Sequence, residues 1–389
     1  MPWLPKVNPS QRLPGRRPLY LGTGFTTMSV QFLGMIGHRL TSEIIAPSGP
    51  IFDKGYVTRF AQAHEQAGFD RILVGYWSDQ PDGFLVTALA GQATQTLKFL
   101  LAHRPGFVAP TLAARKLATL DHLLDGRLAV HIISGGSDGE QRKDGDWLDH
   151  DQRYARTEEF LDVVRQEWTS TQPFDHEGEH YRVANGFSAI KPLQQPSLPV
   201  YFGGSSPAAL RVAGKHADVF ALWGESLAQT RETIAAVRAE AARHGRTPRF
   251  NVSFRVILGD TEDAAWAKAE AIRQQARARL AAEGAVHPAK PEAVGAQRLR
   301  DTVALGDRVD RRLWTGIAAL VGGGHNSTAL VGTAEQVADA LLDYYDLGVD
   351  SFLIRGFDPL NDAVEYGREL IPLTREKVAA RLAAARRTG

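Results

Sequence analysis

Cysteine is absent from this chain of 389 residues, which excludes disulfide bonds, thiolate metal sites and a cysteine nucleophile. Net charge is nearly absent as well, because 45 Lys and Arg residues are balanced by 44 Asp and Glu residues. Such a balance gives no overall field that would attract nucleic acid or a membrane surface. No apolar run approaches the length that spans a bilayer. We therefore expect a cytoplasmic protein without nucleic-acid or membrane partners.

The N-terminal stretch lacks the apolar core of a secretory signal. Residues 1–27 instead carry prolines at positions 2, 5, 9, 14 and 18, which forbid a long helix. We expect an irregular arm here, which either contacts a neighbouring subunit or is a loosely ordered tail.

Short apolar runs alternate with helical patterns over the rest of the chain, which predicts βα units and a parallel sheet. Eight such units at this chain length favour a (β/α)8 TIM barrel over an open doubly wound sheet. The first strand is not followed by the Gly-x-Gly-x-x-Gly of a dinucleotide fold, which supports the same choice. The runs that read as strands are residues 30–36, 71–75, 97–102, 128–133, 200–202, 218–222, 250–258 and 351–354.

The barrel is expected to occupy residues 28–372, with the arm before it and a C-terminal helix at 373–389. Insertions are expected at about 138–151, 173–196 and 262–327. They follow strands four and seven, which assigns them to the C-terminal face, where barrel enzymes have their active sites. The histidines of a hairpin predicted within 173–196 have no recognised metal spacing, so no metal site is expected.

A glycine-rich turn follows the fifth predicted strand. Gly203 and Gly204 permit a tight turn and close approach of the backbone to a ligand, and Pro207 suits the first position of a helix. The hydroxyl groups of Ser205 and Ser206, together with the free N–H groups of a helix start, would suit a phosphate. These residues alone also allow an ordinary strand-to-helix turn with a serine N-cap.

Five segments follow one another along the chain: Leu97–Pro105, Ala113–Asp121, Leu148–Tyr154, Pro199–Ser206 and Thr328–Thr333. In this order they are similar to the bacterial-luciferase-like flavin monooxygenases, and most of all to the alkanesulfonate monooxygenase branch. The resemblance extends over residues 28–372. It implies a (β/α)8 barrel that uses reduced FMN from a separate NAD(P)H-dependent flavin reductase, with O2 as co-substrate. The sulfonate branch cleaves a C–S bond and releases an aldehyde and sulfite, and homodimers or homotetramers are common.

The resemblance also assigns the cofactor residues. It implies that Tyr154 and the turn formed by Gly204, Ser205 and Ser206 hold the FMN phosphate. The end of strand four would lie along the isoalloxazine ring. The residues there are Ser134 and Gly135.

Two histidines are further candidates for the cofactor site. His131 stands where the family usually has an asparagine, and it either touches the flavin or is a hydrogen-bonded core residue. His103 follows strand three and is expected to shape the flavin pocket.

The residues on the substrate side depart from the alkanesulfonate branch. Gln80 stands where the branch has a cysteine after strand two. Ser253 and Arg255 replace an Arg-x-His pair on strand seven. Phe357 replaces a tyrosine after strand eight, and Arg355 stands where the branch has a small residue. The resemblance is therefore stronger for the cofactor than for the substrate.

Arginine suits a sulfonate because its planar donors can bond two oxygens at once and its charge persists at working pH. Arg255 and Arg355 lie on or at the end of predicted barrel strands, so we expect them to bind the sulfonate or to stabilise a flavin peroxide anion. The alternative is an ion pair with a nearby carboxylate such as Asp358 or Asp79.

Histidine is the usual group for proton transfer near neutral pH. His325, in a glycine-rich loop, and His38, after strand one, are the candidates, with a solvated loop histidine as the alternative for each. Trp77 and Trp223 follow strands two and six and are expected to wall the flavin or stack on a sugar, unless they only pack at the rim.

An alkyl chain offers no hydrogen-bond partner to the polar groups of Gln80, Arg255, His325 and Arg355. Burying a polar group without a partner costs free energy. These polar groups favour a hydroxylated substrate, such as a sulfosugar of the sulfoquinovose type. The alternatives are a deazaflavin-dependent oxidoreductase, a non-catalytic flavin-binding barrel, and a flavin-free hydrolase or isomerase.

Overall fold

The structure is a computed structural model that describes residues 29–284, 293–324 and 326–388. The arm expected at residues 1–27 and the candidate His325 lie outside the described residues.

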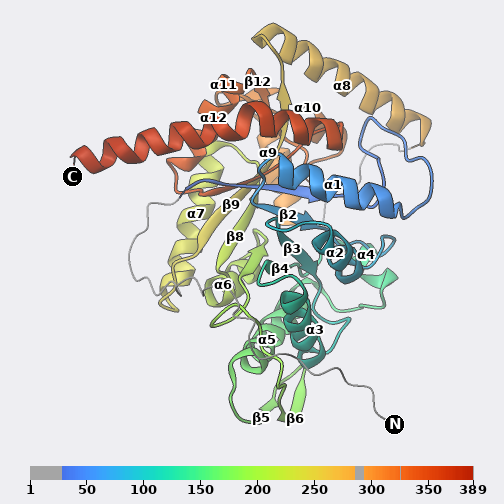
Figure 1. The fold of residues 1–389 in the computed structure, drawn as a ribbon, viewed down its shortest axis with the longest axis vertical. Helices are drawn as coiled ribbons and strands as arrows, with labels where there is room; N and C mark the ends of the chain where they lie inside the picture. The colour runs from blue at the N-terminus through green and yellow to red at the C-terminus, as the bar shows by residue number, and fades with distance from the viewer. Residues whose placement is uncertain (1–28, 285–292, 325, 389) are drawn as a thin grey trace, which may run out of the picture.

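Eight parallel strands close into a barrel (Figure 1), which confirms the predicted (β/α)8 TIM fold. Each strand pairs with the next in chain order, and β13 pairs with β1 to close the sheet. The strands are β1 (Gln31–Ile36), β2 (Arg71–Val74), β3 (Lys98–His103), β4 (Leu128–Ile132), β7 (Val200–Gly203), β8 (Val219–Trp223), β9 (Arg249–Leu258) and β13 (Ser351–Arg355).

Helices cover the outside of the barrel. Most of them begin at an Asp, Ser or Thr whose side chain accepts a backbone N–H of the first turn, as Asp53 does for Tyr56 at 2.9 Å. They are α1 (Lys54–Gln66), α2 (Gly83–Gln92), α3 (Pro110–Leu123), α5 (His150–Thr169), α6 (Pro207–His216), α7 (Leu227–Ala242), α11 (Ala334–Tyr345) and α12 (Pro359–Thr388).

Each barrel strand has one face toward the helices and one toward the barrel axis, because successive side chains point to opposite sides. Partners in register share a face, so the pairs Leu33–Leu353 and Leu100–Ala129 lie on the same side of the sheet. These four residues belong to one small buried cluster, which fills the barrel interior. The opposite face carries residues such as Phe99, which belong to the large core beneath the helices.

The insertion after β4 is divided between the two ends of the barrel. The short helix α4 (Asp138–Lys143) directly follows β4, at the carboxyl end. The predicted hairpin forms from β5 (Phe174–Glu177) and β6 (Arg182–Gly186), but it follows α5 and leads back to the start of β7. Gln194, after the hairpin, donates to the carbonyl of Leu128 at the start of β4 (2.6 Å). Residues 173–196 therefore lie at the amino ends of the strands, contrary to the expected C-terminal position.

The insertion after β9 builds a second small core above the barrel. It contains α8 (Glu262–Ala282), α9 (Val294–Ala304), β10 (Arg308–Val309), β11 (Leu313–Trp314), α10 (Gly316–Leu320) and β12 (Ala329–Gly332). In Figure 1, α8 lies at the opposite end of the molecule from β5 and β6. The C-terminal part of β9, Arg255 to Leu258, pairs with β12, whereas its N-terminal part, Arg249 to Ser253, pairs with β8.

The last helix, α12, is continuous from Pro359 to Thr388 and contains Pro372. The boundary expected at residue 372 therefore falls inside one helix. Among the described residues, no helix combines the length and the apolar character that crossing a membrane requires.

Candidate active site

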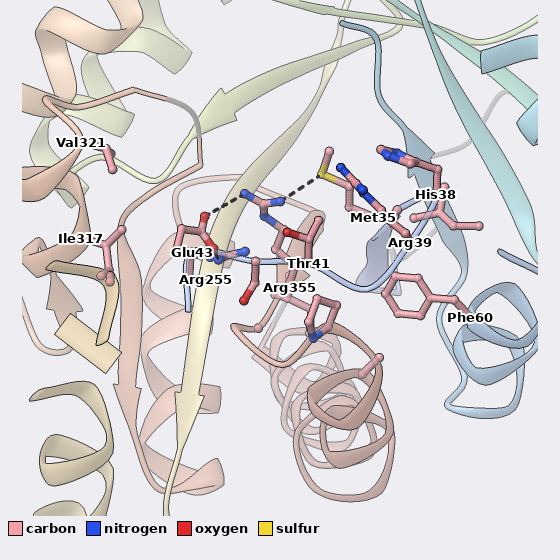
Figure 2. A pocket seen from close by; sticks show the side chains of 18 of the residues that line it. Met35, His38, Arg39, Thr41, Glu43, Phe60, Arg255, Ile317, Val321 and Arg355 are labelled. Carbon is pink, nitrogen blue, oxygen red and sulfur yellow. Dashed lines mark hydrogen bonds and ion pairs between the residues drawn. The ribbon is translucent and has the colours of Figure 1, made fainter. Parts of the chain in front are cut away.

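A cavity of about 420 Å³ opens at the carboxyl ends of β1, β2, β9 and β13 (Figure 2). The loop between β1 and α1 forms one side, and residues of α1, α8, α10 and α12 contribute to the other sides. Enzymes with a (β/α)8 barrel bind their substrates at this end of the barrel.

Two arginines from neighbouring strands line this cavity. Arg255 on β9 and Arg355 on β13 are partners in register, so both side chains lie on the same face of the sheet. Arg255 is 1% exposed, and its guanidinium lies over the ring of Phe357 at 4.1 Å. Arg355 points toward Met35, with Nη1 at 3.6 Å from the sulfur (Figure 2). The structure thus brings together the two arginines that the sequence singled out.

Glu43, in the loop after β1, is the carboxylate that pairs with both arginines. One of its oxygens accepts from Arg255, and the other lies 3.5 Å from Nη2 of Arg355. Burial and the neighbouring Arg255 lower the pKa of Arg355 to about 10, while Glu43 opposes that shift. The ion-pair partners expected from the sequence were Asp358 and Asp79, and sequence reasoning missed Glu43.

A helix of the second insertion fixes the position of Glu43. Arg279 of α8 donates to the carbonyl of Ser42 and, at 2.6 Å, to that of Ile45. The hydroxyl of Ser42 also accepts from the backbone N–H groups of Ile44 (3.2 Å) and Ile45 (3.1 Å). The turn that carries Glu43 is therefore held both internally and from α8.

Three other predicted residues also line the cavity: His38, Trp77 and Gln80. Burial and the nearby Arg39 lower the pKa of His38, against the opposing effect of Asp79. His38 is therefore neutral near pH 7, which is the form that accepts a proton.

Phe357 and Trp223 are placed differently from the other predicted substrate residues. Phe357 is buried beneath Arg255 and supports that arginine by stacking. Trp223 ends β8 and packs on α9, where a Cβ at Gly295 would lie 3.4 Å from its ring.

The glycine turn after β7 meets Tyr154 as expected. Gly204 has a φ of +133°, and a Cβ there would lie 2.7 Å from the Tyr154 hydroxyl. The Ser206 hydroxyl accepts from the N–H of Ala209 (3.2 Å) and hydrogen-bonds with Tyr154, whose pKa is raised by burial. Ser206 is thus the N-cap of α6. Pro207 has no N–H, and the N–H of Ala209 is bound by Ser206. The turn, its serine hydroxyl groups and the N–H of Ala208 fit a phosphate.

Ser134, Gly135 and His131 lie at or near the end of β4, the neighbour of β7. His131 lies close to Gly203, where a Cβ would be 3.6 Å from its ring. Burial lowers the pKa of His131 to about 4, and its Nδ1 has no partner among the described residues. Ser134 hydrogen-bonds to Thr157 at 3.0 Å, and Gly135 has a φ of +86°.

His103 lies apart from these residues. It shares the strand face of Phe99 and Leu101, which belong to the core beneath the helices. Its ring lies 5.9 Å from that of Phe84 and 5.5 Å from that of Phe160, and it is 4% exposed. This position gives His103 a packing role between the barrel and its helices.

His176 and His180, the histidines of the hairpin, both contact Glu159 on α5. The ring of His176 lies 3.0 Å from the carboxylate, and the backbone N–H of His180 donates to it at 2.9 Å. Within the described part of the chain, no group of three or more His, Asp or Glu residues could hold a metal ion.

The comparisons with known proteins agree with this architecture. Residues 30–351 match the family model of the luciferase-like monooxygenases. A riboflavin lyase solved with a modified FMN and riboflavin is 21% identical (TM-score 0.74), covering 90% of this chain and 92% of its own. EDTA monooxygenase from Chelativorans sp. BNC1 is also 21% identical (TM-score 0.70), with coverage of 91% and 98%. An F420-dependent secondary alcohol dehydrogenase is 18% identical (TM-score 0.63), with coverage of 88% and 98%. The family match spans most of the chain, and the chain belongs to the luciferase-like monooxygenase family.

Proposed function

We propose that this protein is the oxygenase of a two-component system that uses FMNH2 and O2 to cleave the C–S bond of an organosulfonate, giving an aldehyde and sulfite. The observation that carries the proposal is the pair Arg255 and Arg355, which face one cavity at the carboxyl ends of the barrel strands. Two adjacent guanidinium groups can donate to all three oxygens of a sulfonate.

FMN is the cofactor in this proposal. Tyr154, Gly204, Ser205 and Ser206 would hold its phosphate, because they combine a close-approach glycine, hydroxyl groups and a helix start. The end of β4, with His131, Ser134 and Gly135, would contact its ring. Reduced FMN would supply the activation of O2.

The residues of the cavity have separate roles in the proposed reaction. Arg255 and Arg355 orient the sulfonate, and His38 accepts a proton from the carbon next to sulfur. The polar side of the cavity, with Thr41 and Gln80, supports a hydroxylated sulfonate such as sulfoquinovose. His325 remains a second candidate for proton transfer.

The proposal includes partners and a location. A separate NAD(P)H-dependent reductase would deliver FMNH2, and the protein would act in the cytoplasm as a homodimer or homotetramer. The reductase and the oligomeric state rest on the family resemblance. The location rests on the absence of cysteine.

The test supplies the protein with enzymatically reduced FMN and air and measures sulfite. The substrate panel runs from short alkyl sulfonates to sulfoquinovose, and Arg255→Met is the control variant. Sulfite from a member of the panel, lost in the variant, supports the proposal. Preferred turnover of long alkyl sulfonates would contradict the sugar substrate, and no sulfite despite FMNH2 binding would contradict desulfonation.

Hydride transfer with a deazaflavin is the second candidate, and the F420-dependent dehydrogenase among the similar structures favours it. It predicts that reduced F420 binds in place of FMNH2. It also predicts neither oxygen consumption nor sulfite, so an oxygen electrode in the same assay separates the two functions.

A further inference from the structure

The two cavity arginines and Glu43 form one charged group, which we name the anion seat: Arg255, Arg355 and Glu43. Each oxygen of the Glu43 carboxylate engages a different arginine. The Nε atoms of both arginines are buried and have no hydrogen-bond partner among the described residues. Donors therefore remain in the seat after Glu43 has been bound, and a buried donor without a partner favours a ligand that satisfies it.

The anion seat carries two positive charges and one negative charge, so its net charge is +1. Arg255 is almost inaccessible to solvent, and charges in such a place are screened weakly. The charge of a ligand headgroup therefore matters more here than it would at the protein surface.

Three other charged residues line the cavity: Arg39, Arg279 and Glu283. Arg279 is paired with Glu283 at 2.8 Å. Arg39 is a further positive charge on the side of His38, whose pKa it lowers. The charge of the anion seat itself depends on whether Glu43 is ionised and in place.

Glu43 is a fixed part of the seat. Ser42 closes the turn through its hydroxyl, and Arg279 binds the carbonyls on both sides of Glu43. A bound anion would share the arginines with Glu43, and it would experience the repulsion of that carboxylate.

We propose that Glu43 is a specificity-determining residue that restricts the cavity to monoanionic headgroups. A sulfonate carries one negative charge, which matches the net charge of the anion seat. A phosphonate dianion has a similar shape but a second charge, which the seat leaves uncompensated beside the Glu43 carboxylate. This inference rests on the proposed function and narrows its substrate class.

The experiment measures the binding of butanesulfonate and butanephosphonate to the full chain by calorimetry, at a pH where the phosphonate is a dianion. The unsubstituted protein is expected to prefer the sulfonate. Glu43→Gln should shift the ratio of the two affinities toward the phosphonate by about tenfold or more, because it removes one negative charge next to the ligand. The double variant Glu43→Gln/Arg355→Gln restores a net charge of +1 and should return the ratio toward its original value.

Glu283→Gln is the matched control, since it removes a carboxylate from the same cavity that is bound to Arg279 and not to the seat. It should change the ratio by no more than about twofold, because Glu283 is a partly exposed ion-pair partner. If Glu43→Gln alone does not fold, the double variant is compared with Arg355→Gln, and it should bind the sulfonate about tenfold more tightly.

An unchanged ratio in Glu43→Gln, a preference of the unsubstituted protein for phosphonate, or no reversal in the double variant would overturn the inference. The binding ratio requires no turnover, so it is independent of desulfonation. A shifted ratio without sulfite release contradicts the proposed function alone, and sulfite release with an unshifted ratio contradicts the role of Glu43 alone.

Discussion

Replacing Gly204 with alanine tests the proposed phosphate site at its most constrained position. The φ of +133° costs a non-glycine residue about 1–3 kcal/mol. The new Cβ would also lie 2.7 Å from the Tyr154 hydroxyl and 2.8 Å from the Cβ of Ala209. Because Ala209 belongs to α6, Tyr154 is the group that must move, and its hydrogen bond to Ser206 would be lost for about 1 kcal/mol more.

These contributions sum to about 2–4 kcal/mol of strain, which the turn relieves by leaving the conformation that would hold a phosphate. We expect FMN affinity to fall by about 30-fold or more, since 1.4 kcal/mol corresponds to tenfold. Fluorescence titration measures FMN binding, and thermal unfolding checks that the variant is folded.

Gly245→Ala is the matched control. Gly245 also has a positive φ (+63°), but a Cβ there would meet nothing within 4 Å, and the residue lies just beyond α7. This variant should lose a little stability and keep its FMN affinity. A folded Gly204→Ala protein that binds FMN as tightly as the original would refute the assignment of the phosphate to this turn.

Three further predictions follow from the cavity and the core. Arg255→Met should lower kcat/KM for the sulfonate by about 10- to 100-fold, because the variant loses a charge-assisted hydrogen bond to the substrate. Unchanged kinetics of sulfite release would contradict the role of Arg255. His38→Gln should lower kcat by about 100-fold or more, and the acid limb of the pH–rate profile, which reports protonation of His38, should disappear with it. Burial, with a smaller contribution from the charge of Lys116, holds the pKa of His103 at about 4, below its usual 6.5, so the folded state binds this proton less readily than the unfolded chain. His103 therefore lowers stability progressively as pH falls from 6.5 to 4, by up to about 3 kcal/mol, and His103→Phe should flatten urea-unfolding free energies across that window relative to the original protein.

The strands and the glycine turn were predictable because their signals are local. Each barrel strand is a short apolar run between turn residues, and the turn at Gly204 combines glycines, serines and a proline within a few positions. By contrast, β12 was not predicted as a strand. It pairs with the far end of β9 and with the two-residue strand β11, and neither pairing has a local signal in the sequence.

The orientation of His103 could not be predicted for a different reason. The residues before it, Phe99 to Ala102, are apolar on both faces, as is usual for a strand buried between the barrel interior and the helices. Without alternation, the sequence does not indicate which residues face the barrel axis. Pairing in the sheet settled this by giving His103 the face of Phe99 and Leu101.

By itself, the sequence determined the number of barrel strands, the place of the candidate phosphate turn and the position of the two arginines on barrel strands, because each depends on neighbouring residues. Only the tertiary structure decided that Arg255 and Arg355 share one cavity and that Glu43 lies between them. Glu43 and Arg255 are 212 positions apart. No local pattern records such a pair, since closure of the barrel brings β1 beside β13 and β13 beside β9.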